Sequence, residues 1–360
     1  MTAKRILAWG EPAPTFRAFS PANARFEFST VAGRFVALIF FGSAKHPRSK
    51  AVLQKLQAEL PHGLACFGVT AHKDELELES VSSTFPHGRV FFDESWAIAK
   101  QYGLVNEGDG GNVTTFKPFW FLLDPTLRVY ASGEIETIGR LCTLAEKLPA
   151  PAHHAGEVEP WAPVLMVPRI LSSEFCRKLV EYYKNGAPSE SGFMRLVDGK
   201  TVPVYDNSFK RRKDVTIEDQ DLQTELRLSL QRRLVPQIKK VFQFDATRVE
   251  RYIVACYDSQ DKGFFRPHRD NTTPATAHRR FAVTINLNTE EYEGGGLRFP
   301  EFGPRVYRAP TGGAVVFSCS LLHEATPVTS GTRFATLPFL YGEADVASRE
   351  ETRKTLAPAS

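Results

Sequence analysis

The chain has 360 residues, of which 24% are charged and 42% are hydrophobic. This length predicts two domains, each able to bury its own core, and the many Leu, Val, Ile and Phe residues exclude a wholly disordered chain. No apolar run reaches the roughly 18 residues of a membrane-spanning helix. The formal net charge of +4 is small for this length and argues against a nucleic-acid partner.

The cysteines predict the redox environment. They are scattered singly, with no CxxC pair, which is typical of buried thiols in a reducing compartment and not of a disulfide framework. The opening residues, MTAKRILAWGEPAPTF, lack the apolar core of a secretory signal. We therefore expect a cytoplasmic protein in which the following five thiols are inert: Cys66, Cys142, Cys176, Cys256 and Cys319.

Residues 1–150 alternate short apolar runs with helical patterns. Helical spacing is present in SKAVLQKLQAEL (49–60) and ESWAIAKQYGL (94–104). The apolar runs, which read as buried strands, are FVALIFFG (35–42), CFGVTA (66–71), RVFFD (89–93) and FWFLLD (119–124). This alternation predicts an α/β domain with a partly parallel sheet.

Pro, Ala and Gly dominate the stretch PAPAHHAGEVEP (149–160), and residues 151–160 are expected to form a linker to a second domain, residues 161–345. That domain begins with two amphipathic helices, at 172–186 with Ser172 as N-cap and at 221–242. Only strand-like runs follow them, which predicts an α+β domain built on an antiparallel sandwich or barrel. Residues 346–360 are polar and are expected to fray.

Two His-x-Asp motifs are candidate metal sites. The first is His72-Lys73-Asp74, and the second is His268-Arg269-Asp270. Side chains two positions apart on a strand point the same way, so both can reach one ion. The first motif has no accompanying ligands and is expected to be a loop with a helix-capping Asp74.

The second motif has the partners that the first lacks. His323 follows Asp270 by 53 positions, and Arg333 follows His323 by ten, at the start of a strand. Two His and one carboxylate form the facial triad of non-haem Fe(II) oxygenases, which leaves coordination positions open. A guanidinium on the next strand can hold the distal carboxylate of 2-oxoglutarate through two parallel hydrogen bonds.

From about Trp161 to Glu343 the chain resembles the 2-oxoglutarate- and Fe(II)-dependent oxygenases of the prolyl hydroxylase branch. The matching segments are ACYDSQDKGFFRPHRDN, NLN…GGGLRFPEFG and GGAVVFSCSLLHEATPVTSGTR. The resemblance implies a double-stranded β-helix (jelly-roll) core, with His268, Asp270 and His323 as iron ligands and Arg333 as the 2-oxoglutarate anchor. It also implies a co-substrate contact for Tyr257 and for Asn286, which stands about where some members have a Tyr. Ascorbate is expected as a reductant.

Several charged residues around these motifs remain open to two interpretations. Arg269 and Asn271 flank the ligands, where they would either orient them or only hydrogen-bond within their loop. The basic run 210–213 and Asp214 are expected to form a solvated charged rim, with the border of a substrate cleft as the alternative.

About residues 8–148 resemble a peroxiredoxin, which implies a thioredoxin-like fold. The segments are ALIFFGSAKHPRSKAVLQKLQ, FFDESWAIAKQYGL and FWFLLDPTLRVYASGEI. Ser49 stands roughly where the peroxidatic cysteine belongs, and residues 42–50 contain no Cys. Because the attacking group must be a thiolate, this domain is expected to be redox-inactive and to serve docking, shielding or homodimer formation.

The sequence thus predicts a hydroxylase of an unactivated C–H bond, most simply in a prolyl or similar residue of a protein or peptide, with succinate and CO₂ as co-products. Hydroxylation of a free amino acid or small metabolite is the alternative within enzymes. A binding module that senses oxygen or 2-oxoglutarate is the alternative outside them.

Overall fold

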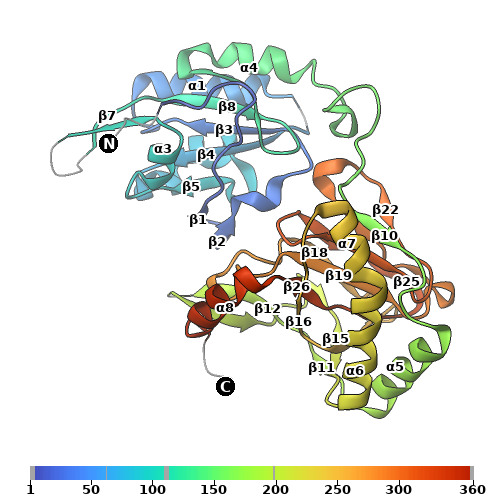
Figure 1. Ribbon diagram of the computed structural model, residues 1–360. Coiled ribbons are helices and arrows are strands. Elements are labelled where there is room, and N and C mark those ends of the chain that lie inside the picture. Colours follow the sequence, from blue (N-terminus) through green and yellow to red (C-terminus); the bar gives the residue numbers. More distant parts are fainter. Residues whose placement is uncertain (1–4, 62, 109–112, 198, 357–360) are drawn as a thin grey trace. The chain divides into compact units, whose positions relative to one another are not determined.

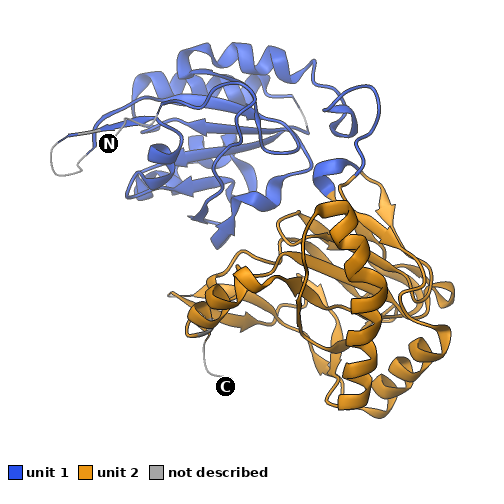
Figure 2. Cartoon of the chain, in the orientation of Figure 1, with its two compact units in different colours: residues 1–161, 300–303 blue, residues 162–299, 304–360 orange. Residues whose placement is uncertain are grey.

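Figure 1 shows the computed structural model of the chain, which describes residues 5–61, 63–108, 113–197 and 199–356. No helix among these residues is long and apolar enough to cross a membrane. The chain divides into two units, residues 1–161 with 300–303 and residues 162–299 with 304–360 (Figure 2). Residues 300–303 belong to the first unit, although the sequence pattern places them within the second domain.

A seven-stranded sheet forms the centre of the first unit, in the order β2-β1-β5-β4-β3-β8-β9. Strands β3, β4 and β5 run parallel, whereas β8 and β9 are antiparallel to their neighbours. The expected α/β domain with a partly parallel sheet is therefore confirmed. The strands are β1 (Arg17–Ser20), β2 (Asn23–Glu27), β3 (Val36–Phe40), β4 (Ala65–Thr70), β5 (Val90–Phe92), β8 (Phe119–Leu123) and β9 (Val129–Glu134).

Both faces of this sheet are covered, which explains why β3 and β8 are apolar at every position. On one face Ile39 packs in a cluster with residues of α1, α2 and α4. On the other face Phe40 contacts the rings of Tyr102 and Phe121. The remaining elements are α1 (Pro47–Glu59), α2 (Glu79–Thr84), α3 (Ala97–Gln101), α4 (Ile138–Ala145) and the hairpin of β6 (Val105–Glu107) and β7 (Val113–Phe116).

The second unit is built on a large antiparallel sheet. Its path is β10-β23-β19-β25-β17-β15-β11, with β16, β20 and β26 paired beside it. The bounds are β10 (Leu165–Val167), β11 (Ser189–Glu190), β15 (Lys213–Thr216), β16 (Arg248–Glu250), β17 (Ile253–Asp258), β19 (Phe281–Asn286), β20 (Tyr292–Gly294), β23 (Ala314–Ser318), β25 (Val328–Thr336) and β26 (Phe339–Tyr341).

A smaller five-stranded sheet has the order β14-β18-β24-β21-β22, and a separate hairpin joins β12 to β13. Successive side chains of β17 point alternately toward the smaller sheet and toward the helices. Tyr257 belongs to a cluster that includes Phe265 of β18 in the smaller sheet, whereas Cys256 packs in the cluster that contains the helices. The bounds are β12 (Phe193–Val197), β13 (Lys200–Val204), β14 (Lys210–Arg211), β18 (Phe264–His268), β21 (Leu297–Arg298), β22 (Val306–Tyr307) and β24 (His323–Ala325).

Helices precede most of these strands, as the sequence predicts, so the α+β double-sheet class is confirmed. Helix α5 (Ser173–Asn185) begins at the expected N-cap, where the Ser172 hydroxyl accepts a hydrogen bond from the Phe175 N–H at 3.1 Å. The second predicted helix is interrupted by a π-helical segment (Leu230–Leu234) between α6 (Gln220–Ser229) and α7 (Val235–Phe242). Pro236 explains the interruption, because proline lacks an N–H and its ring crowds the carbonyl four residues earlier.

The prediction that residues 346–360 fray is wrong for most of that segment, since Val346–Arg353 form α8. Buried Asp345, just before α8, accepts hydrogen bonds from Arg280 and from the Gly342 N–H. Beyond α8, the Thr355 carbonyl accepts from the Thr201 N–H of β13 at 2.8 Å. These non-local contacts fix a segment whose composition alone is that of a tail.

Candidate metal centre

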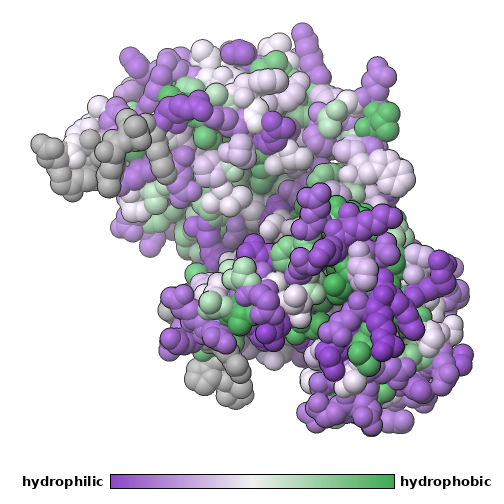
Figure 3. All heavy atoms as spheres, viewed as in Figure 1, coloured by the Kyte–Doolittle hydropathy of each residue, from purple (hydrophilic) through white to green (hydrophobic). Residues whose placement is uncertain are grey.

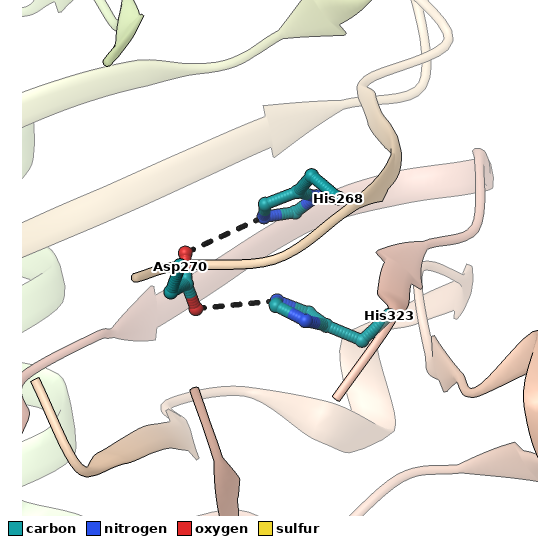
Figure 4. Close-up of side chains that lie close together, drawn as sticks. All are labelled: His268, Asp270 and His323. Atoms are coloured by element: carbon teal, nitrogen blue, oxygen red, sulfur yellow. Dashed lines mark ion pairs between the residues drawn. The ribbon is translucent and has the colours of Figure 1, made fainter. Parts of the chain in front are cut away.

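His268, Asp270 and His323 converge in the smaller sheet of the second unit (Figure 4). His268 ends β18 and His323 begins β24, and the two are register partners. The Asp270 N–H donates to the Cys319 carbonyl at 3.0 Å, which brings the carboxylate beside both imidazoles. The Asp270 carboxylate oxygens lie 3.6 Å from His268 Nε2 and 3.4 Å from His323 Nε2. The sequence-predicted triad is therefore assembled by strand pairing.

Both imidazoles are oriented by backbone carbonyls. His268 Nδ1 lies 2.8 Å from the Arg266 carbonyl, and His323 Nδ1 lies 3.1 Å from the Leu321 carbonyl. Each Nδ1 acts as the donor in these contacts, because a carbonyl only accepts. In the neutral rings the Nε2 lone pairs then point toward Asp270, where a metal ion would bind.

The charges also suit a divalent cation. Burial alone would raise the pKa of Asp270, but the neighbouring His323 and His268 lower it well below its usual range. Burial, followed by the nearby His268, lowers the pKa of His323 to about 4. Near neutral pH the site therefore offers an ionised carboxylate and a neutral imidazole at His323. With His268, this donor set fits Fe(II) in a facial arrangement.

The first His-x-Asp motif forms no such site. In the described residues, the only cluster of three or more His, Cys, Asp or Glu side chains with metal-binding spacing is the one above. His72 precedes a short 3₁₀ helix, and its side chain does not cap that helix. The Asp74 carboxylate does not cap it as expected and instead forms an ion pair with Lys45.

Arg333 lies in β25 with only 2% of its surface exposed. Its Nε and Nη1 have no hydrogen-bond partner among the described residues, although buried donors are almost always paired. Tyr257 is its register partner on β17, and the guanidinium carbon lies 4.9 Å from the phenol ring centre. A buried cation with unused donors fits the distal carboxylate of 2-oxoglutarate.

Asn286, for which the resemblance also implies a co-substrate contact, lies next to Arg333. Its Nδ2 donates to the Ala309 carbonyl at 2.8 Å, and its Oδ1 accepts from Arg333 Nη2 at 3.5 Å. Both ends of the amide are therefore used by the protein, and the side chain orients the Arg333 guanidinium.

Tyr292 is a buried side chain at this site that the sequence interpretation missed. Its hydroxyl has no hydrogen-bond partner in the described part of the chain. A Cβ placed on Gly295, whose φ is +60°, would lie 2.9 Å from the Arg333 Cδ and 3.4 Å from the Tyr292 Cε2. Glycine here lets the backbone pass close to both side chains. No spacing in the sequence marks Tyr292, because strand tyrosines are common in cores.

Arg269 and Asn271 connect the two ligand-bearing segments. The Arg269 guanidinium donates to the Ser320 carbonyl, and the Asn271 amide donates to the Ser320 hydroxyl at 2.8 Å. Ser320 lies three residues before His323. These contacts link the loop of Asp270 to the turn that leads into His323.

The predicted solvated rim at residues 210–214 is wrong for three of its members. Lys210 and Arg212 are buried, and the Asp214 side chain is only 17% exposed. The Asp214 carboxylate accepts from Arg212, and the hydroxyl of Ser191, which is distant in sequence, accepts from both Lys210 and Arg212.

The region corresponding to a peroxidatic site is occupied by other contacts. Ser49 is buried, and its hydroxyl donates to the Phe41 carbonyl at 2.5 Å. The buried Glu75 carboxylate accepts from the Ser43 hydroxyl and from the Ala44 N–H. All five cysteines are buried and unbridged. Burial raises the pKa of Cys66 to about 12, which disfavours its thiolate.

Residues 252–341 match the model of the 2OG-Fe(II) oxygenase superfamily. The multifunctional procollagen lysine hydroxylase and glycosyltransferase LH3 of Rattus norvegicus is 30% identical over 181 residues, which are 48% of this chain and 22% of that protein. The chain thus spans about a fifth of the length of this curated relative. A prolyl hydroxylase from Trichoplax adhaerens has 18% identity and a TM-score of 0.40, covering 51% of this chain and 86% of its own. The Xanthomonas campestris bacterioferritin comigratory protein has 16% identity and a TM-score of 0.33, and the match covers 40% of this chain and 98% of that protein.

Proposed function

Residues 252–341 carry a 2OG-Fe(II) oxygenase domain, and we propose that the chain uses it to hydroxylate an unactivated C–H bond in a prolyl or similar residue of a protein or peptide. One observation carries the proposal: the buried Arg333 guanidinium, with two unused nitrogens, accompanies a complete triad of His268, Asp270 and His323. A scaffold would gain nothing from keeping a buried cation that has no ion-pair partner among the described residues.

Iron and 2-oxoglutarate together supply oxidative decarboxylation, which yields succinate and CO₂ and directs one oxygen atom of O₂ into the substrate. The residues of the chain hold and shield these groups. His268, Asp270 and His323 would bind the metal, and Arg333 would bind the distal carboxylate. Phe265 stacks on the His268 imidazole with ring centres 3.5 Å apart, which excludes water from one side of that ligand. Ascorbate would keep the iron in its reduced form.

A protein substrate is favoured by the relative that hydroxylates procollagen lysine and by the resemblance of the sequence to prolyl hydroxylases. For the N-terminal unit we infer a non-catalytic role in docking the substrate or pairing two chains. Light scattering on the full chain tests the pairing, because a monomer at all concentrations would exclude it.

The test of the proposal is a product search. Cell lysate is incubated with the full chain, Fe(II), 2-oxoglutarate and ascorbate, and peptides that gain one oxygen atom are identified by mass spectrometry. Asp270→Ala serves as the matched control, since it removes one metal ligand. We expect oxidised peptides and succinate with the wild type only. Oxidation confined to the low-mass fraction would assign a metabolite substrate, and no succinate above the control would reject the enzyme.

A further inference from the structure

A buried polar cluster lies where the chain crosses from the smaller sheet to the larger one, between β14 and β15. Arg212 Nη2 donates to Asp214 Oδ2 at 2.6 Å and to the Ser191 hydroxyl at 2.8 Å. Lys210 Nζ donates to the same hydroxyl at 2.7 Å and to the Gly192 carbonyl at 2.6 Å. The Arg212 side chain is only 4% exposed, so its direction is fixed by these contacts.

The fixed Arg212 guanidinium faces Tyr257. Its Nη1 lies 3.4 Å from the Tyr257 hydroxyl oxygen, and its carbon lies 5.8 Å from the ring centre. Arg333 faces the same ring at 4.9 Å. Tyr257, itself 3% exposed, therefore lies in contact with two buried guanidinium groups. Arg212 is paired with Asp214 and Ser191 and leaves only its Nε without a hydrogen-bond partner among the described residues, whereas Arg333 leaves both Nε and Nη1 without one.

The hydrogen-bonding capacity of a phenol determines which way the Tyr257 O–H bond points. A tyrosine hydroxyl has one proton to donate and lone pairs to accept, whereas a guanidinium only donates. When the Tyr257 oxygen accepts from Arg212, its own proton must point elsewhere. A carboxylate held by Arg333 is the acceptor that such a proton would meet. Without Arg212, that hydroxyl would be free to rotate.

We propose that Arg212, held by Asp214, is a positioning residue that directs the Tyr257 hydroxyl proton toward the distal carboxylate of the co-substrate beside Arg333. This inference rests on the proposed function, because it takes 2-oxoglutarate as the ligand of Arg333. Asp214 neutralises the charge of Arg212 through their ion pair, so the positive charge that attracts the ligand carboxylate is that of Arg333.

The competing interpretation is that Arg212 and Asp214 form only a structural ion pair at the edge of the large sheet, where β15 pairs with β11. Two ligands separate the interpretations. 2-Oxoglutarate has both the 2-oxo acid end and the distal carboxylate, whereas oxalate would bind the metal but has no distal group. A positioning role affects only 2-oxoglutarate, whereas structural damage affects both ligands.

The experiment measures equilibrium binding of 2-oxoglutarate and of oxalate to the full chain loaded with Fe(II) in the absence of oxygen. The variants are Arg212→Gln, Tyr257→Phe and the double variant, with Arg212→Lys as a conservative substitution. Lys213→Gln is the matched control, because it removes one positive charge from the neighbouring, exposed position. Circular dichroism verifies that each variant is folded.

We expect Arg212→Gln and Tyr257→Phe each to weaken 2-oxoglutarate binding about tenfold, as for loss of a hydrogen bond to a charged group. The double variant should bind 2-oxoglutarate no more weakly than the single variant with the lower affinity. The affinity of Arg212→Lys for 2-oxoglutarate should lie between those of the wild type and Arg212→Gln. The affinity for oxalate should not change in any of them. Unchanged 2-oxoglutarate affinity, an equal loss for oxalate, or fully additive effects would each overturn the positioning role. If Arg212→Gln does not fold, Arg212→Lys decides: unchanged 2-oxoglutarate affinity in that variant rejects the role. A wild type that binds no 2-oxoglutarate would instead overturn the proposed function.

Discussion

His268 and His323 are register partners across the β18–β24 pair, and their imidazole rings lie 4.2 Å apart, centre to centre. The pairing of two strands, and not proximity in sequence, thus sets the spacing of the two nitrogen ligands. Asp270 completes the triad because its N–H is held by Cys319, in the turn that precedes β24.

Removing any of these three ligands should remove most of the bound metal. We expect His268→Ala, Asp270→Ala and His323→Ala to lose Fe(II) and nearly all 2-oxoglutarate turnover, because Fe(II) binds such sites less tightly than later first-row metals. His72→Ala and Asp74→Ala are the matched controls and should keep both. The measurement is metal content with the visible charge-transfer band under anaerobic 2-oxoglutarate. A band of unchanged intensity in His268→Ala, or its loss in folded His72→Ala, would show that the site is misassigned.

Arg333 should govern the affinity for 2-oxoglutarate and not the affinity for iron. Its guanidinium would meet only the distal carboxylate, so Arg333→Ala should weaken 2-oxoglutarate binding about tenfold or more. Arg333→Lys should be milder, because it keeps the charge and loses the planar fork. Calorimetric titration of the metal-loaded chain measures both. Equal affinities in the wild type and the Ala variant would mean that another residue anchors the co-substrate.

The N-terminal unit should have no thiol peroxidase activity. Ser49 stands in place of the peroxidatic thiol. Burial raises the pKa of both Cys66 and Cys142, so their thiolate forms are disfavoured. Peroxide consumption is measured with the full chain, stripped of metal by a chelator, in the presence of a thioredoxin reducing system. Turnover of about 1 s⁻¹ or more would contradict the prediction, since that is an ordinary enzymatic rate.

The sequence reveals what local pattern encodes. The apolar run at 35–42, the N-cap at Ser172 and the His-x-Asp motif at 268–270 each have a signature within a few residues, and each is found in the structure. The prediction of a solvated rim is wrong for Lys210 and Arg212 because a basic run is typical of an exposed surface. Their burial depends on hydrogen bonds to the hydroxyl of Ser191, which is distant in sequence. Tyr292 had no signature because its neighbourhood with Arg333 arises from the pairing of β20 with β25.

Glu250 links β16 to the loop that follows the metal ligands. Its carboxylate lies 2.6 Å from His278 Nε2 and accepts from Arg279 Nη2 at 2.6 Å, while Arg279 Nη1 reaches the Asp270 carbonyl at 3.4 Å. Burial would raise the pKa of Glu250, but the hydrogen bonds from His278 and Arg279 outweigh it and lower the pKa to about 2. A carboxyl group whose pKa is lower in the folded state stabilises the fold at any pH above its unfolded value.

Glu250→Gln should therefore lower the free energy of unfolding of the second unit by about 3 kcal/mol at neutral pH, which corresponds to the shift from 4.5 to about 2. The difference between variant and wild type should shrink as the pH falls below about 4.5, because the unfolded carboxyl then binds a proton. All four tryptophans, Trp9, Trp96, Trp120 and Trp161, belong to the first unit, so Trp fluorescence in urea reports that unit and should not change. Hydrogen exchange of peptides from β16 and β19 measures the second unit, and Glu293→Gln, at an exposed position, is the control. A loss that is equal at pH 7 and pH 3.5, or equal to that of Glu293→Gln, would show that the charge of Glu250 does not stabilise the fold.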